Sequence, residues 1–156
     1  MAQFDHKGRW TVKVKDGAGT PKEATFTDVG DFKFDGLEAG GRTVTPVYER
    51  HNYAGSVASD EKQITGSFSV NRRAETLTHA SSDRLADIVN RAGAWNAATT
   101  VDPSGDSEVW MVDIVYSDGT SSYTFNTCRL VAASDESSDP VKYTVSFTCY
   151  EGVTIA

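Results

Sequence analysis

The sequence predicts a mainly β protein, an antiparallel β-sandwich or barrel of about seven to eight strands with one short flanking α-helix. Apolar and polar residues alternate with a period of two through most of the chain, and turn signals such as Asp-Gly separate the alternating stretches. Only one segment instead spaces its apolar residues as a helix does. The 156 residues fit one compact unit, so we expect a single β domain over residues 1–156.

The first expected strand lies in the stretch RWTVKVKDG. Its alternation places Trp10, Val12 and Val14 on one face and threonine and lysine on the other. The Asp16-Gly17 pair that ends the stretch is a turn signal. We therefore expect a half-buried strand followed by a tight reversal of the chain.

The next two expected strands each carry a residue that disturbs regular pairing. Gly30 interrupts the parity of the extended stretch 23–36, which predicts a bulge or bend. Pro46 lies inside the stretch RTVTPVYER, residues 42–50. Since proline cannot donate a hydrogen bond to a neighbouring strand, this strand is predicted to be at an edge or to carry a bulge.

The stretch 62–70 shows the clearest alternation of this part of the chain. Its apolar face carries Ile64, Phe68 and Val70. Its polar face carries Gln63, Thr65, Ser67 and Ser69. The polar residues 51–61 precede it, and we expect them to form a loop of about a dozen residues between two strands. Loops of this length usually carry function or are disordered.

The segment SSDRLADIVNRAGAW, residues 81–95, is the expected helix, spanning about residues 82–92. Its apolar residues recur at i, i+3, i+4 and i+7 and are Leu85, Ile88, Val89 and Ala92. Ser81 or Ser82 can cap its start, and Gly93 is a suitable left-handed terminator. A helix of about three turns is not stable alone, so we expect it to pack on the sheet and close one end of the barrel.

The last strands surround a strong hairpin signal. Asp118-Gly119 separates two apolar-rich stretches, and this dipeptide favours a two-residue hairpin turn. The strand before it is expected to be covered on both sides, because both of its faces are largely apolar. The closing stretch 141–149 alternates again, with Thr144, Ser146 and Thr148 on its polar face.

The composition gives no support for catalysis, a metal site or a cofactor. With 22 acidic against 15 basic residues, the net charge of −7 argues against a protein that grips nucleic acid through phosphates. The three histidines stand apart from one another and from the cysteines, and no nucleophile or phosphate-binding motif occurs. We therefore expect no enzyme, no metal and no cofactor. No apolar run is long enough for a membrane helix, so we expect no membrane insertion by this chain.

Cys128 and Cys149 are 149 − 128 = 21 positions apart, which matches neither a metal-binding spacing nor a disulfide framework. The expected state is two reduced, partly buried thiols. A single bridge between neighbouring strands is the alternative.

Three polar strand faces carry short neutral side chains almost exclusively. Besides the polar faces of stretches 62–70 and 141–149, a third carries Ser122, Thr124 and Asn126. Threonine favours strands in any case. Exposed strands usually also use lysine or glutamate, however, and a face of short hydroxyl groups suits the smooth wall of a channel.

The order of these elements resembles the tail tube proteins of tailed bacteriophages. The stretches that carry the resemblance are GRWTVKVKDG, RTVTPVYERHNYAGSVASDEKQITGSFSV, SSDRLADIVNRAGAW, VWMVDIVYSDGTSSYTFNTCRL and VKYTVSFTCYEG. The resemblance implies hexameric rings that stack into a hollow tube, an architecture shared with the type VI secretion tube protein. Each subunit would add strands to a continuous inner barrel, through which the genome leaves the capsid.

The resemblance also implies partners and a location. The chain would bind itself, the tape measure protein that fills the tube, and the tail terminator and baseplate or tip proteins. Phage DNA would pass without specific binding. The protein would reside in the tail of the virion after assembly in the host cytoplasm, and it would use no cofactor.

Candidate roles then follow from strand parity and position within this resemblance. The candidate lumen-facing residues are Gln63, Thr65, Ser67, Ser69, Thr144, Ser146 and Thr148. The candidate inter-ring loop contains His51, Asn52, Tyr53, Ser56, Asp60 and Glu61. The candidate helix at the subunit boundary contributes Leu85, Ile88, Val89 and Ala92.

Two alternatives remain open. One is another virion ring, decoration or tail-terminator protein, which would not polymerise. The other is a β-sandwich module that binds a ligand through exposed aromatic residues such as Tyr48, Tyr53 and Trp95.

Overall fold

The computed structural model describes residues 10–26, 29–37, 42–71, 85–106, 108–117, 120–135 and 142–156. Within these ranges the chain is mainly β, as predicted, with ten strands and one short α-helix. The strands are β1 (Thr11–Lys15), β2 (Glu23–Phe26), β3 (Val29–Asp35), β4 (Val44–Glu49), β5 (Asn52–Ala58), β6 (Ile64–Asn71), β7 (Val112–Ser117), β8 (Ser122–Asp135), β9 (Lys142–Cys149) and β10 (Val153–Ile155). The helical elements are α2 (Leu85–Asn90) and the 3₁₀ turn η4 (Gly93–Trp95).

Eight of the strands form one antiparallel sheet, and β8 divides it into two halves. The order is β2-β1-β7-β8-β9-β6-β3, and β10 also pairs with β8. Residues 122–128 of β8 pair with β7, whereas residues 128–135 pair with β9. Thr127, with φ 56°, adopts a left-handed conformation where the partner changes. We call β2, β1, β7, residues 122–128 of β8 and β10 the five-stranded half, and residues 129–135 of β8 with β9, β6 and β3 the four-stranded half.

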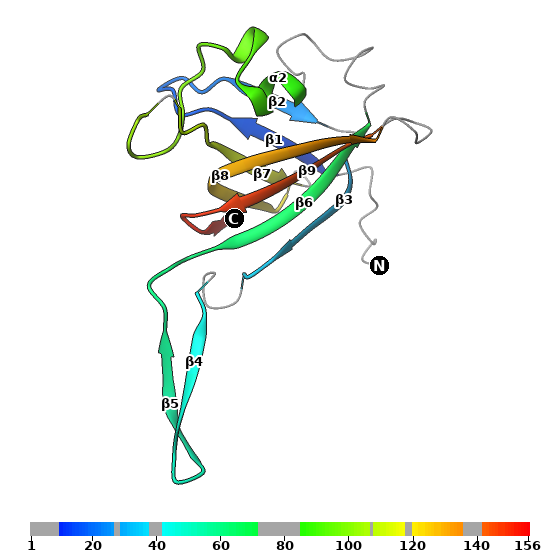
Figure 1. Cartoon of the computed structure of the whole chain (residues 1–156). Coiled ribbons are helices and arrows are strands. Elements are labelled where there is room, and N and C mark those ends of the chain that lie inside the picture. The colour runs from blue at the N-terminus through cyan, green and yellow to red at the C-terminus, as the bar shows by residue number, and fades with distance from the viewer. Residues whose placement is uncertain are drawn as a thin grey trace.

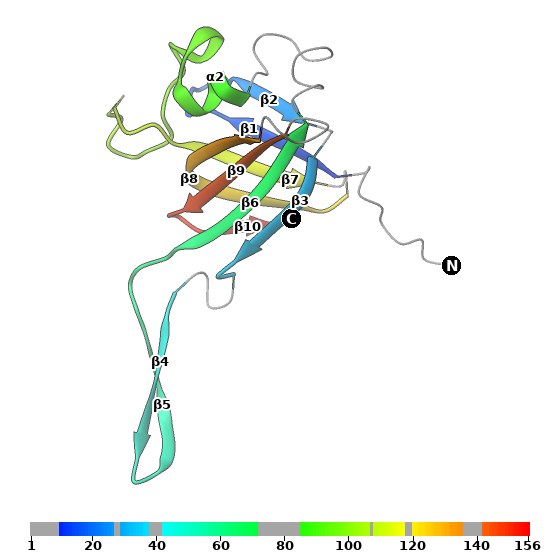
Figure 2. The ribbon, with the colours of Figure 1, turned by 45° about the vertical axis from the view of Figure 1, so that its right-hand side comes forward.

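The two halves cross over one another (Figures 1 and 2). Aromatic side chains from both halves pack together in the core. Phe32 of β3 stacks on Tyr116 of β7 with ring centroids 3.9 Å apart, although these strands lie at distant positions in the sheet order. Phe125 of β8 contacts both Phe34 at 5.3 Å and Phe147 at 5.1 Å between ring centroids. Burying these rings supplies much of the apolar area that stabilises a domain of this size.

Several sequence predictions are confirmed strand by strand. Val12 and Val14 of β1 are fully buried, and β1 turns back to pair with β2. The register of β3 against β6 shifts between Gly30 and Lys33, which is the predicted bulge. Strands β7 and β8 pair as an antiparallel hairpin, while the Asp118-Gly119 dipeptide itself lies outside the described residues.

The predicted helix is present at Leu85–Asn90, but it ends differently from the prediction. Arg91 rather than Gly93 is the left-handed terminator, with φ 52°. Arg91 N donates to Ile88 O and Ala92 N donates to Asp87 O, the hydrogen-bond pair of a Schellman motif. The Arg91 guanidinium fixes this conformation by donating to Ala98 O from Nε at 3.0 Å and from one terminal nitrogen at 2.7 Å. The expected caps Ser81 and Ser82 lie outside the described residues.

The loop predicted over residues 51–61 is wrong for most of its length. Residues Asn52–Ala58 form strand β5, which pairs with β4 in a separate two-stranded sheet. Strand β6, which follows this segment, pairs with β3 and β9 rather than with β4. Pro46 agrees with its predicted place, because β4 has β5 as its strand partner and the register shifts between Val47 and Tyr48.

Candidate assembly site

The β4–β5 hairpin projects away from the body of the molecule, at the end opposite α2 (Figures 1 and 2). We call Val44–Ala58 the arm. Its tip is a two-residue turn, Arg50 and His51, with φ values of 48° and 70°. Two positive φ values in succession are typical of the type I′ turn, whose twist matches that of the strands it joins. At the base, Ser59 N donates to Thr43 O at 2.8 Å, which holds the two strands together.

The arm exposes apolar side chains on both of its faces. Every residue of β4 is exposed, and in β5 only Gly55 is even partly buried. The exposed fractions of its large apolar residues are Val44 47%, Val47 45%, Tyr48 66%, Tyr53 62% and Val57 62%. By the strand register, Val44, Tyr48 and Tyr53 share one face, and Val47 and Val57 share the other. A monomer rarely presents so much apolar surface without a binding function.

The residues predicted for the inter-ring loop fall into two groups. His51, Asn52, Tyr53 and Ser56 belong to the arm, with His51 in the turn. Tyr53 and Ser56 join through their hydroxyl oxygens at 2.5 Å. Asp60 and Glu61, in contrast, lie beyond the base, in the exposed link to β6.

The short polar side chains of β6 and β9 lie on one surface of the four-stranded half. Directly opposite pairs join Thr65 to Thr148, Ser67 to Ser146 and Ser69 to Thr144. We call these six residues the hydroxyl face. The apolar residues between them, such as Phe68, Val145 and Phe147, are buried on the opposite surface.

One candidate lumen residue and the third polar strand face do not belong to the hydroxyl face. Gln63 is exposed but precedes β6, so its predicted place on the strand is wrong, because the regular pairing of β6 begins at Ile64. The third polar face, Ser122, Thr124 and Asn126, lies on the five-stranded half, where the Asn126 amide donates to Gly152 O at 3.2 Å.

Charged and apolar residues flank the hydroxyl face on both sides. On β3, Lys33 lies opposite Ser67 and Asp35 opposite Thr65. On β8, Arg129 lies opposite Thr148, and the 60% exposed Val131 lies opposite Ser146. One row across the four strands therefore runs from Asp35 to Arg129, with opposite charges at its two ends.

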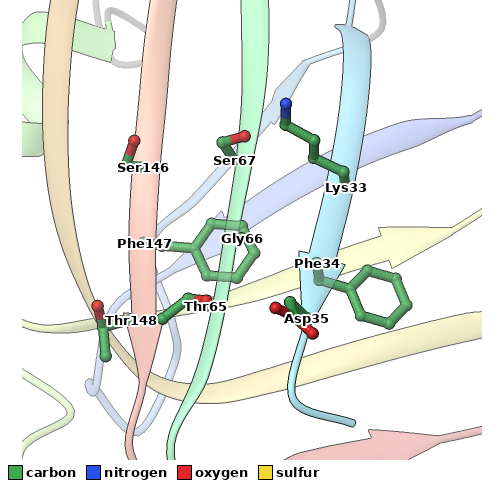
Figure 3. A pocket seen from close by; sticks show the side chains of 9 residues that line it. All are labelled: Lys33, Phe34, Asp35, Thr65, Gly66, Ser67, Ser146, Phe147 and Thr148. Atoms are coloured by element: carbon green, nitrogen blue, oxygen red, sulfur yellow. The ribbon is translucent and has the colours of Figure 1, made fainter.

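A hollow of about 440 Å³ lies over β3, β6 and β9 (Figure 3). Two rows of side chains line it, Lys33, Ser67 and Ser146 in one and Asp35, Thr65 and Thr148 in the other. Gly66 lies between the rows. A Cβ there would come within 2.4 Å of the Phe147 ring and 2.7 Å of Lys33 O, so this crowded point requires glycine.

Both outer strands of the four-stranded half present an edge. In the part of the chain that the structure describes, β3 pairs only with β6, and residues 129–135 of β8 pair only with β9. Successive strands of this half are antiparallel, so its two edge strands run in opposite directions. In the five-stranded half the corresponding edges, β2 and β10, run in the same direction.

Three of the four candidate helix residues, Leu85, Ile88 and Val89, contribute to the core. Leu85 and Ile88 are fully buried, and Trp110 Nε1 donates to Ile88 O at 2.7 Å. Ala92 is exposed and lies after the end of the helix, so its place on the apolar stripe is wrong. The Schellman ending at Arg91 is the reason, because it stops the helix at Asn90, two residues before the predicted end. Trp95 is also buried, so it cannot be an exposed ligand-binding aromatic.

Sequence reasoning assigned no role at the arm to Val44, Val47 or Val57, and none at the hydroxyl face to Lys33, Asp35 or Arg129. The hairpin of the arm is hard to predict from the sequence, because its turn lacks the Asn-Gly or Asp-Gly dipeptide typical of two-residue hairpins. The sequence feature that could have predicted this hairpin is a pair of β-prone stretches of similar length on either side of Arg50 and His51.

Among the residues that the structure describes, no three histidine, cysteine or acidic side chains gather as they would around a metal ion. None of the helices in the described ranges is long and apolar enough to cross a membrane.

The comparisons with known proteins give no family assignment: no protein-family model matches this chain, and no curated protein matches it either.

Proposed function

We propose that this chain is the tube-forming subunit of a bacteriophage tail. Copies associate edge to edge into hexameric rings, the rings stack into a hollow tube, and the genome passes through the bore during ejection. The tape measure protein occupies the bore before ejection, and tail terminator and baseplate or tip proteins bind the two ends of the tube. The protein belongs to the virion tail and is assembled in the host cytoplasm.

The arm is the observation that carries this proposal. A two-stranded hairpin is at best marginally stable in water unless another surface packs against it. This arm extends about 20 Å from the body at the strand rise of 3.3 Å per residue, and it exposes valine and tyrosine side chains on both faces. A neighbouring copy in the next ring would bury those side chains, so the arm links ring to ring.

The four-stranded half suits closure into a ring. Copies related by rotation about a ring axis present their strands in the same direction, so residues 129–135 of β8 in one copy would meet β3 of the next. Since these two edges run in opposite directions, the new pairing would be antiparallel, like every other pairing of the sheet. The five-stranded half would have to pair its edges in parallel.

The hydroxyl face is proposed to line the bore. Its six serine and threonine side chains are short and uncharged, so they leave the passage open and offer no cation to DNA phosphates. On the flanking strands Lys33 and Arg129 are accompanied by Asp35, and the net charge of the chain is −7. DNA would therefore pass such a wall without being held by it.

The direct test is assembly of the purified chain. Size-exclusion chromatography with light scattering, over a wide range of concentrations, should show hexamers and larger species. Negative-stain electron microscopy should then show rings and tubes with a central channel. A protein that stays monomeric at every concentration would exclude the proposal, and rings that never stack would favour a terminator or decoration protein.

A variant of the arm separates stacking from ring formation. Replacing Tyr48, Tyr53 and Val57 by serine removes exposed apolar side chains without touching the core. We expect rings but no tubes from this variant. A matched control replaces the exposed Tyr150 and Ile155, which lie outside the arm, and should assemble as the wild type does. Normal tubes from the arm variant would contradict the role of the arm.

A further inference from the structure

Cys128 and Cys149 are direct neighbours across two paired strands. Cys128 of β8 lies opposite Cys149 of β9 in the strand register. Tyr150 N donates to Thr127 O at 3.1 Å, and this hydrogen bond beside the pair identifies it as a non-hydrogen-bonded pair of the antiparallel ladder. In such pairs the Cα atoms are about 4.5 Å apart and the side chains approach closely. A disulfide accepts Cα separations from about 4.4 Å upwards, so the backbone already fits one.

The two thiols lie where three strands meet. Both cysteines are fully buried and both thiols are free. The Cys149 thiol donates to Asn126 O at 3.0 Å and to Gly152 O at 3.3 Å, and the Cys128 thiol donates to Phe125 O at 3.4 Å. The pair therefore joins the bend of β8 at Thr127 to the turn between β9 and β10.

The surroundings make the two thiols unequal. The neighbouring Cys128 thiol lowers the pKa of Cys149 to about 7, against the opposing effect of burial. The same interaction, together with burial, raises the pKa of Cys128 far above its usual range. Of the two thiols, Cys149 is therefore the one that is more readily deprotonated to the reactive thiolate.

We propose that Cys128 and Cys149 form a redox-responsive pair that closes into an intramolecular disulfide when the protein meets a small oxidant such as hydrogen peroxide. The Cys149 thiolate attacks one peroxide oxygen; the S–O bond forms, the O–O bond breaks, and hydroxide leaves to become water. The sulfur of Cys128 then attacks the Cys149 sulfenic acid. The S–S bond forms, and the thiol proton and the hydroxyl group leave as a second water.

A bridge here would fix the junction between the two halves of the sheet. It would tie β8 to β9 beside Thr127, where the strand changes partners, and close a loop of 149 − 128 = 21 positions. Access of the oxidant requires local opening, for which the turn at Tyr150 and Glu151 is suited, because both residues are exposed. A particle released from a reducing cytoplasm would meet oxidising conditions; that setting, unlike the bridge itself, rests on the proposed function.

The test uses the purified full chain before and after treatment with hydrogen peroxide. We expect the oxidised monomer to lose both thiols in a titration under denaturing conditions and to have a mass lower by about 2 Da. Its Tm should rise by about 5 to 10 °C, and dithiothreitol should reverse both changes. Peptide mapping should find Cys128 joined to Cys149 within one chain.

Cys128→Ser and Cys149→Ser provide the controls, since neither can form the bridge. Peroxide should leave their Tm unraised and produce no monomer with the lower mass. The wild-type mass is informative even if these variants fold poorly. The proposal is overturned if wild-type protein keeps both thiols, or gains only oxygen, under conditions that oxidise glutathione. Each of these results is independent of whether the chain forms tubes.

Discussion

At the scale of single residues, Asp113 and Asp16 show how carboxylates shape this β fold. Asp113 lies at the register shift of β7, and its Oδ1 accepts a hydrogen bond from Thr127 N at 2.9 Å. That bond supports the left-handed conformation of Thr127, where β8 passes from one half of the sheet to the other. Burial raises the pKa of Asp113 most, the Thr127 hydrogen bond opposes it, Glu151 raises it further and Lys15 lowers it.

The raised pKa of Asp113 predicts a pH dependence of stability. Because the folded carboxyl binds its proton at a higher pH than in the unfolded chain, its contribution to stability increases as the pH falls through the folded pKa. Asp113→Asn keeps an oxygen acceptor for Thr127 and removes the titration. The free energy of unfolding of the variant, minus that of the wild type, should therefore be larger at pH 7 than near pH 4. Urea unfolding at both pH values measures it. A difference independent of pH would contradict the prediction, and Asp60→Asn, in an exposed link, is the control.

Asp16 is buried, and its carboxylate accepts hydrogen bonds from three backbone N–H groups. Its Oδ1 accepts from Lys22 N at 2.7 Å and Ala18 N at 3.2 Å, and its Oδ2 accepts from Thr99 N at 3.2 Å. Asp16→Ala leaves these donors without their acceptor, so we expect a loss of about 2 kcal/mol in the free energy of unfolding. Urea denaturation measures this loss. A change below about 0.5 kcal/mol would show that the carboxylate does not hold the β1–β2 turn against Thr99.

At the scale of elements, the alternation of apolar and polar residues predicts most strands of the sheet. The geometry of the turns could not be predicted from the sequence. The parity of β6 and β9 correctly placed the hydroxyl face, because burial on one side of a sheet fixes which residues point outward. The arm was mistaken for a loop, because Arg50 and His51 form a turn that usually selects asparagine and glycine. The helix ends two residues early, because hydrogen bonds from the Arg91 guanidinium to Ala98 O hold Arg91 in a left-handed conformation. Ala98 lies seven residues further along the chain, beyond the apolar spacing that predicts the helix.

The tip of the arm supplies a prediction at the same scale. Arg50 and His51 both adopt positive φ values, which are strained for residues with a Cβ. Replacing them by Asn-Gly should relieve that strain and slow hydrogen exchange of the amides that pair β4 with β5 by about tenfold. Amides that pair β1 with β2 should exchange as before. Equal or faster exchange in the arm would mean that the turn is not what limits its stability.

At the scale of the whole molecule, the two ends differ from each other, and so do the two edges of the four-stranded half. The arm leaves the body at one end, and α2 lies at the other (Figure 1). The edges of the four-stranded half run in opposite directions on its two sides, with Asp35 near one edge and Arg129 near the other. In the proposed tube, the arm would stack one ring on the next, and these edges would pair copies side by side within a ring. The division of the sheet into two halves could not be predicted from the sequence, because it depends on the change of partner of β8 near Thr127.

The opposite charges at these edges give a last prediction. In the strand register that brings Asp35 of one copy beside Arg129 of the next, attraction favours ring closure, whereas Lys33 at that place would repel Arg129. Asp35→Arg or Arg129→Asp alone should raise the concentration needed for rings about tenfold. The double variant, which restores opposite charges with reversed signs, should return it to within about twofold of wild type. Light scattering against concentration measures each value, and Glu108→Lys, at an exposed position outside the four-stranded half, is the matched control. If the wild type forms rings and the single variants form them equally well, the copies meet along other edges, and the pairing of β3 with β8 is wrong while the ring remains.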